Sequence, residues 1–253
     1  MITNPAITTG SPLIPEPFWI TAPREPDLVA ETASCLVVYK PPGMHTAPLR
    51  KEEVGTLLAW AASLFPEVLH IRGRKENEGG LLHRLDYETQ GLVLIARTEA
   101  ALAVLAAQQE KNLFIKEYDA VCETPRSAEA ENMAGFPQFT GDSPTEGTCI
   151  VSAFRPFGKG RKAVRPIPDG KSLYRTEILS RVEDGGRHFF RLRIRKGFRH
   201  QIRCHLAWVK YPLLNDSLYG ENRDGGFLAL RASALAFADP ESGESRTYRL
   251  PLT

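Results

Sequence analysis

The amino-acid sequence predicts an α+β fold with a central, mostly antiparallel sheet that helices and loops flank. Apolar segments of strand length outnumber the helical ones, and two of them are joined by a short glycine turn that is typical of a β-hairpin. The helical segments do not alternate strictly with the strands, as they would in a parallel sheet. The 253 residues are enough to bury a sizeable core.

The first half of the chain predicts strands and helices in turn. CLVVYK (residues 35–40) is a short buried strand, which the following Pro-Pro-Gly ends. Residues 55–65 and 99–109 have helical period and composition, and Thr98 is placed to cap the second helix. Residues 117–123 alternate as a strand.

The second half predicts more strands. Residues 125–146 are rich in Pro, Ser, Glu and Gly and indicate an irregular connection. SLYRTEILSRV and HFFRLRIRK form a strand pair across EDGGR. RHQIRCHLAWVK (199–210) is helical, with Ile202, Leu206 and Val209 on one face. The segments GFLALRASALAFA and RTYRLPL close the chain as strands.

Charge is unevenly distributed along the sequence. Residues 155–203 hold 15 Lys and Arg against four Asp and Glu, a net charge of +11, whereas the rest of the chain holds 17 basic and 26 acidic residues, a net of −9. This asymmetry favours a surface that binds a polyanion, and nucleic acid is the favoured polyanion. The alternative is a solvated strand face, which can be equally basic.

Several classes of protein are disfavoured by composition. No apolar run approaches the roughly 20 residues that span a bilayer, and the N-terminus does not resemble a secretory signal. The four cysteines are widely spaced, with no CxxC and no metal-ligand cluster. We therefore expect a cytoplasmic protein with reduced thiols and without structural zinc.

The segment GGLLHRLDYETQGLVLIAR (79–97) places Asp86 on a turn between two apolar runs. A carboxylate that enters a core costs several kcal/mol unless it is paired. Asp86 is therefore either half of a structural Asp–Arg pair or a carboxylate that is held ready to react.

Five stretches of the sequence resemble the motifs of one family. HRLDYETQGLVLIAR resembles the signature of pseudouridine synthases of the RluA family. VVYKPPGMHTAP, KEYDAV, GFRHQIRCHLA and NDSLYG resemble its Lys-Pro-x-Gly, Lys-x-Tyr, Gly-Arg-x-His-Gln-Ile-Arg-x-His-Leu and Gly-Asp-x-x-Tyr-Gly motifs. One such motif is weak support, but five in the family's order from Val37 to Gly220 make chance agreement improbable.

The resemblance implies the pseudouridine synthase fold and the isomerisation of specific uridines in ribosomal or transfer RNA to pseudouridine. Asp86 corresponds to the nucleophile, which forms a covalent adduct with the ribose or with the base. Tyr118 matches the active-site tyrosine, whose ring packs on uracil with its phenol near the C5 proton. No cofactor is expected, because nothing is oxidised and no group is donated.

The resemblance also gives different roles to two arginines. Arg203 corresponds to the cation that keeps the nucleophile ionised by lowering its pKa, although a phosphate contact or a surface charge is the alternative. Arg84 matches the residue that fills the space left by the extruded uridine, and a structural pair with Asp86 is the alternative.

The family includes members with an N-terminal S4-type RNA-binding domain. About 35 residues precede the first motif here, so we expect an N-terminal arm over residues 1–30, a catalytic domain over 31–253 and no S4 domain. RGRKE (72–76) and FRPFGKGRKAVRP (154–166) are then the expected RNA-binding segments, the second with Phe154 and Phe157 for unstacked bases. The candidate RNA-binding residues are Arg84, His83, Lys159, Arg161, Lys162, Arg199 and His200.

A metal site is not expected, because the spacing of five between His200 and His205 misses one face of a helix. We interpret the histidines as structural or RNA-contacting. The expected partner is RNA, with no membrane, and we expect a monomer.

The sequence departs from the family pattern in three places. Phe198 stands where an Arg is usual, Gln90 replaces a small residue, and Asn215 replaces a glycine. These changes bear on the choice of substrate RNA. Two other interpretations are an RNA-binding protein that kept the fold but lost the reaction, and a carboxylate-based glycosidase, which normally needs paired carboxylates.

Overall fold

The computed structural model describes residues 17–50, 53–73, 75–123, 135–220 and 225–251. The strands are β1 (Asp27–Glu31), β2 (Cys35–Lys40), β3 (Gln90–Ala96), β4 (Ile115–Glu123), β5 (Cys149–Phe157), β6 (Ala163–Ile167), β7 (Tyr174–Asp184), β8 (Arg187–Ile194), β9 (Leu230–Ala238) and β10 (Ser245–Arg249). The helices are α1 (Leu57–Leu64), α2 (Glu99–Glu110) and α3 (Gln201–Trp208), with short 3-10 turns at Pro66–Leu69 and Lys159–Arg161.

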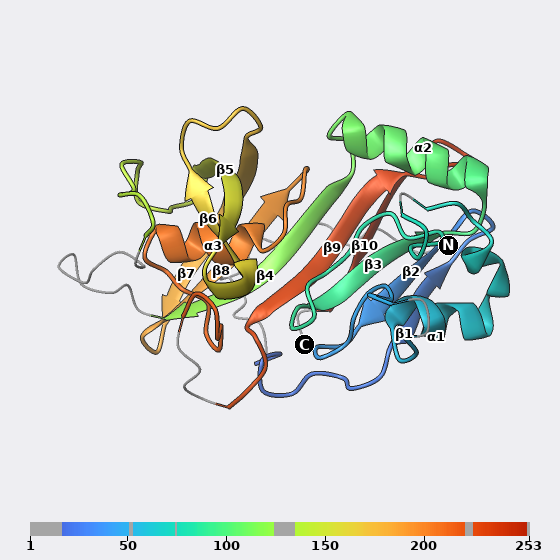
Figure 1. Ribbon diagram of the computed structural model, residues 1–253, viewed down its shortest axis with the longest axis horizontal. Helices are drawn as coiled ribbons and strands as arrows, with labels where there is room; N and C mark the ends of the chain where they lie inside the picture. Colours follow the sequence, from blue (N-terminus) through green and yellow to red (C-terminus); the bar gives the residue numbers. More distant parts are fainter. Residues whose placement is uncertain (1–16, 51–52, 74, 124–134, 221–224, 252–253) are drawn as a thin grey trace.

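One long sheet joins these strands, and Figure 1 shows it running through the molecule. The strand order is β1-β2-β3-β9-β4-β8-β7-β5-β6, with β10 paired to β9. Every pairing between the described strands is antiparallel except the short parallel contact of β3 with β9. The predicted fold class, α+β with a mostly antiparallel sheet, is confirmed.

Local sequence accounts for the element boundaries. The Thr98 hydroxyl accepts a hydrogen bond from the Ala101 N–H at 3.1 Å and so caps α2, as predicted, while Thr56 caps α1 in the same way. The predicted β7–β8 hairpin turns at Gly185 and Gly186, both with positive φ. Of the irregular connection expected at 125–146, residues 135–146 contain no helix or strand and the rest lies outside the described residues.

The two faces of the sheet are covered by different helices. Leu36 and Val38 of β2 face the core that includes α1 and α3, whereas Cys35 and Val37 face the core that includes α2. This alternation is the period-2 pattern of a strand that is buried on both faces. No helix among the described residues is long and apolar enough to cross a membrane.

The N-terminal region contacts the sheet in two places. Phe18 and Trp19 are buried against Val121 and Phe189, on the face opposite α3. Further along, β1 pairs with β2 as the edge strand. Of the N-terminal arm expected at 1–30, residues 1–16 lie outside the described residues.

Gly91 is the second residue of β3, the strand that follows the polar turn around Asp86. It pairs with Lys40 on one side and with Ala232 on the other, and Ala232 pairs in turn with Tyr118. Its φ is +120°, and a Cβ atom at this position would lie 2.3 Å from the Ala232 carbonyl oxygen. Only glycine allows the turn to enter the middle of the sheet at this point.

We predict that Gly91→Ala lowers the free energy of unfolding by more than the cost of placing alanine at a positive φ. A strained backbone conformation costs about 1–3 kcal/mol, and the clash with Ala232 adds to it. Gly147→Ala is the matched control, because Gly147 has a φ of +81° and a Cβ atom there would meet no described atom within 4 Å beyond the adjoining residues. Urea unfolding measures both variants, and equal losses of unfolding free energy would contradict the prediction.

Candidate active site

The main chain on both sides of Asp86 is held by the segment that follows β2. The Leu85 N–H donates to the Thr46 hydroxyl at 3.1 Å, and this hydroxyl donates back to the Leu85 carbonyl at 2.9 Å. On the other side, the Tyr87 carbonyl accepts from the Gly43 N–H at 2.9 Å. Asp86 therefore projects from a loop whose position is set by hydrogen bonds rather than by helix or strand.

The buried Lys40 side chain also links the segment after β2 to the loop of Asp86. Its side chain is fully buried, and Nζ donates to the carbonyls of Pro41 at 2.9 Å, Met44 at 2.8 Å and Tyr87 at 3.2 Å. Burial lowers the pKa of Lys40 to about 7, although the nearby Asp86 charge opposes this shift. The Lys-Pro-x-Gly motif thus ties a turn to the loop of Asp86.

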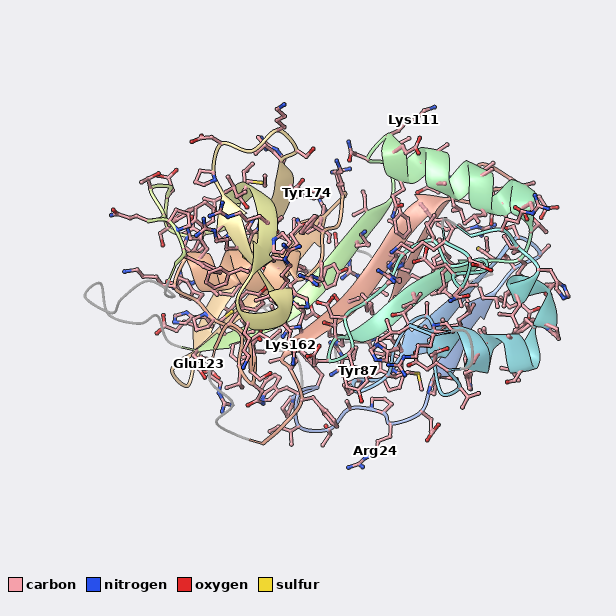
Figure 2. The ribbon with its side chains drawn as sticks, viewed as in Figure 1. Arg24, Tyr87, Lys111, Glu123, Lys162 and Tyr174 are labelled. Carbon is pink, nitrogen blue, oxygen red and sulfur yellow. The ribbon has the colours of Figure 1, made fainter. Side chains whose placement is uncertain are left out.

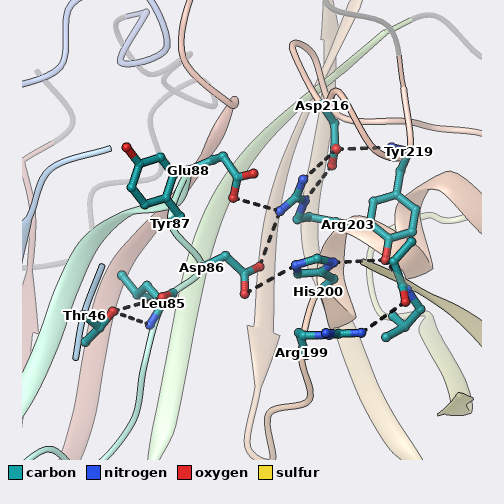
Figure 3. A network of polar contacts seen from close by, with 12 residues as sticks. Thr46, Leu85, Asp86, Tyr87, Glu88, Arg199, His200, Arg203, Asp216 and Tyr219 are labelled. Carbon is teal, nitrogen blue, oxygen red and sulfur yellow. Dashed lines mark hydrogen bonds and ion pairs between the residues drawn. The ribbon is translucent and has the colours of Figure 1, made fainter. Parts of the chain in front are cut away.

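Arg203 of α3 lies among three carboxylates, as Figure 3 shows. Nε and Nη2 each donate to an oxygen of Asp216 at 2.8 Å, and both side chains are buried. Nη1 lies 3.7 Å from Oδ2 of Asp86 and 3.3 Å from Oε2 of Glu88. One edge of the guanidinium is therefore bound to Asp216, and the remaining nitrogen is shared between Asp86 and Glu88.

The electrostatics of Asp86 differ from the sequence-based expectation. Burial raises the pKa of Asp86 to about 6, and the charges of Glu88 and Asp216 add to the effect, against the lowering by Arg203 and Lys40. The expected lowering by a cation is present, but it does not offset burial because Arg203 already faces two other carboxylates. Asp86 is mainly ionised at neutral pH.

Tyr118 lies on the same face of the sheet as α3. It is buried in β4, next to a bulge in the pairing with β9. Burial raises the pKa of its phenol, and the charge of Asp86 raises it further. The hydroxyl is therefore neutral throughout the physiological pH range.

The residues just before α3 connect the site to the β5–β6 hairpin (residues 149–167). His200 Nε2 lies 3.9 Å from Asp86 Oδ1, and its Nδ1 lies 3.2 Å from the Tyr219 hydroxyl. Arg199 donates from Nη2 to the carbonyls of Arg161 at 2.8 Å and Ala163 at 3.1 Å. The candidate RNA-binding residues Arg199 and His200 thus lie between the hairpin and Asp86.

Two other candidate residues lie apart from this cluster. Arg84 is half exposed, and its Nη1 lies 3.3 Å from Oε1 of Glu78 rather than beside Asp86. His83 accepts a hydrogen bond at Nε2 from the Leu94 N–H at 3.2 Å, and its ring lies against Phe114. This geometry matches the structural interpretation of His83. It does not support Arg84 as the structural partner of Asp86.

Among the histidines, His205 also has a structural environment. Ser152 lies 3.0 Å from its Nε2 and Thr176 lies 2.8 Å from its Nδ1, and the ring is fully buried. Within the described ranges, no group of three or more His, Cys, Asp or Glu side chains is arranged to hold a metal ion.

The basic stretch at 155–203 divides into two parts. Arg191 and Arg193 are neutralised across the sheet by Asp119 at 3.2 Å and Glu117 at 2.7 Å. The exposed basic residues of the stretch are Arg155, Lys159, Arg161, Lys162, Lys171, Arg175, Lys196 and Arg199. In Figure 2, Lys162 lies at the end of the hairpin, toward the middle of the molecule. The positive surface is therefore smaller than the net charge of the stretch indicates.

The aromatic residues of the hairpin do not extend this surface. Phe154 stacks on Phe198 with ring centroids 5.1 Å apart, and Phe157 packs edge-on against Phe136 at 5.8 Å. The expectation that Phe154 and Phe157 receive unstacked bases therefore finds no support in their packing, because both rings are engaged within the protein.

Comparison with known proteins agrees with this geometry. Residues 34–208 match the model of the protein family described as "RNA pseudouridylate synthase". The chain belongs to this family. It is 27% identical over 252 residues to "Ribosomal large subunit pseudouridine synthase D" of Neisseria meningitidis serogroup A, with 94% of this chain and 60% of the relative covered.

An uncharacterized RNA pseudouridine synthase of Chloroflexus aurantiacus is 32% identical over 217 residues, with 84% of this chain and 61% of the relative covered. The chain thus spans about 60% of the length of these curated relatives. The solved structure of human RNA Pseudouridylate Synthase Domain Containing 1 matches with a TM-score of 0.58 at 20% identity, covering 90% of this chain and 83% of that one. The pseudouridine synthase fold is confirmed.

The departures from the motifs of this pseudouridylate synthase family have local structural causes. Gln90 accepts a hydrogen bond from the Tyr39 hydroxyl at 2.8 Å. Asn215 has a φ of +61°, a conformation that asparagine tolerates better than most residues and that glycine adopts freely. Phe198 supplies one ring of the stack with Phe154.

Two site residues of this synthase-family chain receive no role from the sequence alone. Asp216 and Tyr219 both belong to NDSLYG, which lies beyond α3. Their place in that motif is the one feature of the sequence that could have marked them as site residues. Their partners Arg203 and His200 are visible only once the chain is folded.

We predict that Asp86→Asn does not lower thermal stability at neutral pH. Because the folded-state pKa of Asp86 is about 6 and its ordinary value is 3.8, ionised Asp86 costs folding free energy. The wild type gains stability from this residue below pH 4 and loses it as the pH rises through 6. Relative to the wild type, the variant should therefore become more stable between pH 4 and pH 7.5, as measured by thermal unfolding.

Asp119→Asn is the matched control, because Asp119 is buried and paired with Arg191 and Arg231 on the opposite face. It should melt at a lower temperature at pH 7.5. If Asp86 were only a structural ion-pair partner, its variant would show a similar loss, roughly 3–5 kcal/mol for a broken buried pair.

Proposed function

We propose that this chain is an RNA pseudouridine synthase that uses Asp86 as its nucleophile. The observation that carries the proposal is the placement of Asp86, in a chain of this family, on a hydrogen-bonded loop beside a buried arginine. A carboxylate with a pKa of about 6 is ionised at neutral pH but is held at some energetic cost, which favours a reactive role over a purely structural one.

The reaction moves the glycosidic bond of uridine from N1 to C5 of the base. Attack by the Asp86 carboxylate on the ribose or the base gives a covalent adduct, and the N1–C1′ bond breaks. The uracil then turns, C5 joins C1′, and the bond to Asp86 breaks to free the carboxylate. The C5 proton then leaves, and a proton at N1 keeps the balance. No oxidant, reductant or second substrate is needed, so the roles fall to side chains.

Arg203 and Tyr118 have distinct tasks in this scheme. Arg203 opposes the effect of burial and so keeps Asp86 available as an anion near neutral pH. Tyr118 offers a buried ring on which uracil packs. Because its phenol is neutral, it assists loss of the C5 proton by hydrogen bonding or by relaying a proton, and not as a phenolate.

Ribosomal RNA is the proposed substrate class. Several curated relatives at 27–29% identity carry the name "Ribosomal large subunit pseudouridine synthase D". The exposed basic residues on and beside the β5–β6 hairpin suit a phosphate backbone, and Arg199 places this surface next to His200 and Asp86.

Tritium release from RNA labelled with 5-³H-uridine tests the proposal. The substrates are ribosomal and transfer RNA fractions from cells that lack the gene, each incubated with excess enzyme. The wild type should release tritium from the ribosomal fraction. Asp86→Asn should lose many orders of magnitude in rate, because no neighbouring group forms the same adduct. Tyr118→Phe should bind RNA normally and fail to complete turnover.

The matched control is Asp169→Asn, an exposed residue outside the site, which should keep the wild-type rate. No release by the wild type from either fraction, with RNA binding retained, would favour the alternative of an inactive RNA-binding protein. Substantial turnover by Asp86→Asn would overturn the assignment of the nucleophile.

We predict that the combined replacement of Lys159, Arg161 and Lys162 by Ala flattens the salt dependence of RNA binding. Each phosphate contact on single-stranded RNA contributes about −0.7 to the slope of log affinity against log salt. Arg24→Ala with Lys111→Ala is the control, since both residues are exposed and lie away from the hairpin in Figure 2. An unchanged slope in the triple variant would place the RNA surface elsewhere.

A further inference from the structure

His200 has an unusual position for a histidine at the start of a helix. It precedes α3 in the left-handed conformation, with a φ of +54°, and its side chain is only 11% exposed. Its ring stands perpendicular to the Tyr219 ring, with centroids 5.8 Å apart. One ring nitrogen faces Tyr219 and the other faces Asp86, so the proton that the neutral ring carries has two possible places.

Tyr219 restricts this choice. Its oxygen accepts the Val164 N–H from β6 at 2.7 Å, which leaves its own O–H free to donate to His200 Nδ1, 3.2 Å away. The phenol keeps that proton, because burial raises its pKa. A neutral His200 that accepts at Nδ1 carries its proton on Nε2, the nitrogen that faces Asp86.

The surrounding charges keep the ring neutral. Burial lowers the pKa of His200 to about 4, and the cations Arg203 and Arg199 lower it further than Asp216 and Glu88 raise it. Asp86 is ionised only at higher pH, since its pKa is about 6. Over the pH range in which the carboxylate reacts, His200 is therefore a neutral donor and not a second cation.

The two oxygens of Asp86 consequently face different groups. Oδ2 faces Arg203 Nη1 at 3.7 Å, and Oδ1 faces His200 Nε2 at 3.9 Å (Figure 3). Both distances exceed a direct hydrogen bond, and contacts of this kind commonly shorten when substrate fills the site. With Arg203 at one oxygen and His200 at the other, the carboxylate plane of Asp86 is held in one orientation. Arg203 alone would leave the carboxylate freer to rotate.

From this arrangement we propose that His200 is a positioning residue for Asp86 and that Tyr219 selects its Nε2–H tautomer. The proposal rests on the proposed function, since it concerns the nucleophile of that reaction. The series of hydrogen bonds that selects the tautomer begins at the Val164 N–H of the basic β5–β6 hairpin. The orientation of Asp86 therefore depends on the position of this hairpin.

The first measurement does not require activity. Nitrogen-15 NMR of the full chain, labelled at histidine and free of RNA at pH 7.5, reports which ring nitrogen of His200 is protonated. The signal is assigned by its loss in His200→Gln. We expect the Nε2–H tautomer in the wild type and a mixture of both tautomers in Tyr219→Phe. A wild-type Nδ1–H tautomer would overturn the proposal.

The second measurement compares two amides at the same position. His200→Gln places an amide nitrogen near the former Nε2, whereas His200→Asn places it near the former Nδ1. Asparagine is the more tolerant of the positive φ, so the backbone favours the variant that we expect to be slower. In single-turnover tritium release, His200→Asn and His200→Ala should lose on the order of 10²-fold, the cost of a misplaced reacting group.

His200→Gln should recover most of that rate, and RNA affinity should change by less than about twofold in all three variants, a difference of under 0.5 kcal/mol. Equal rates for Gln and Asn, or a loss that lies entirely in RNA affinity, would overturn the positioning role. If the wild type makes no pseudouridine, the proposed function fails, while the NMR result still decides the tautomer. The two failures are thus distinguishable.

Discussion

The buried guanidinium of Arg203 imposes the main constraint on this structure. A cation that is removed from water must find acceptors for its N–H groups, or the helix that carries it does not pack. Asp216 supplies two acceptor oxygens at 2.8 Å, and this pair connects α3 to the segment that leads toward β9. The guanidinium of Arg203 is also the cation that faces the Asp86 carboxylate, with Nη1 3.7 Å from Oδ2. One side chain therefore serves both the packing of α3 and the charge environment of Asp86.

The same constraint explains why Asp86 is ionised without being strongly stabilised. Arg203 faces three carboxylates, so its charge is divided among them. Lys40 is nearby, but its N–H groups are directed to main-chain carbonyls and its contribution is electrostatic only. The pKa of about 6 for the Asp86 carboxyl results from a balance between burial, which raises it, and the charges around it. An arginine paired with Asp86 alone would hold the pKa of that carboxyl lower.

Sequence reasoning identified those features that depend on local patterns. The strands at 35–40 and 117–123, the Thr98 cap and the glycine turn at 185–186 follow from period, composition and capping chemistry, which operate over a few residues. The resemblance supplied the family and the candidate residues Asp86, Tyr118 and Arg203, which the fold brings to one face of the sheet together with Arg199 and His200.

What the sequence left open depends on contacts between distant segments. The bond of Arg203 to Asp216 and the neutralisation of Arg193 by Glu117 join elements that no periodicity relates. For this reason the net charge of residues 155–203 overstated the free positive surface. Phe154 was interpreted from its basic neighbours in sequence, whereas its position is set by a stack with Phe198 across the fold.

The order in which the chain is synthesised gives the Arg203–Asp216 pair a further consequence. Asp86 and Tyr118 leave the ribosome early, Arg203 follows much later, and Asp216 comes last of the four. Domains generally fold as units during synthesis, and strands that pair over long sequence separations form late. A nascent chain that ends before residue 216 contains Arg203 without the Asp216 carboxylate that binds two of its nitrogens. The buried ion pair between α3 and the segment after it therefore forms only once most of the chain has been synthesised.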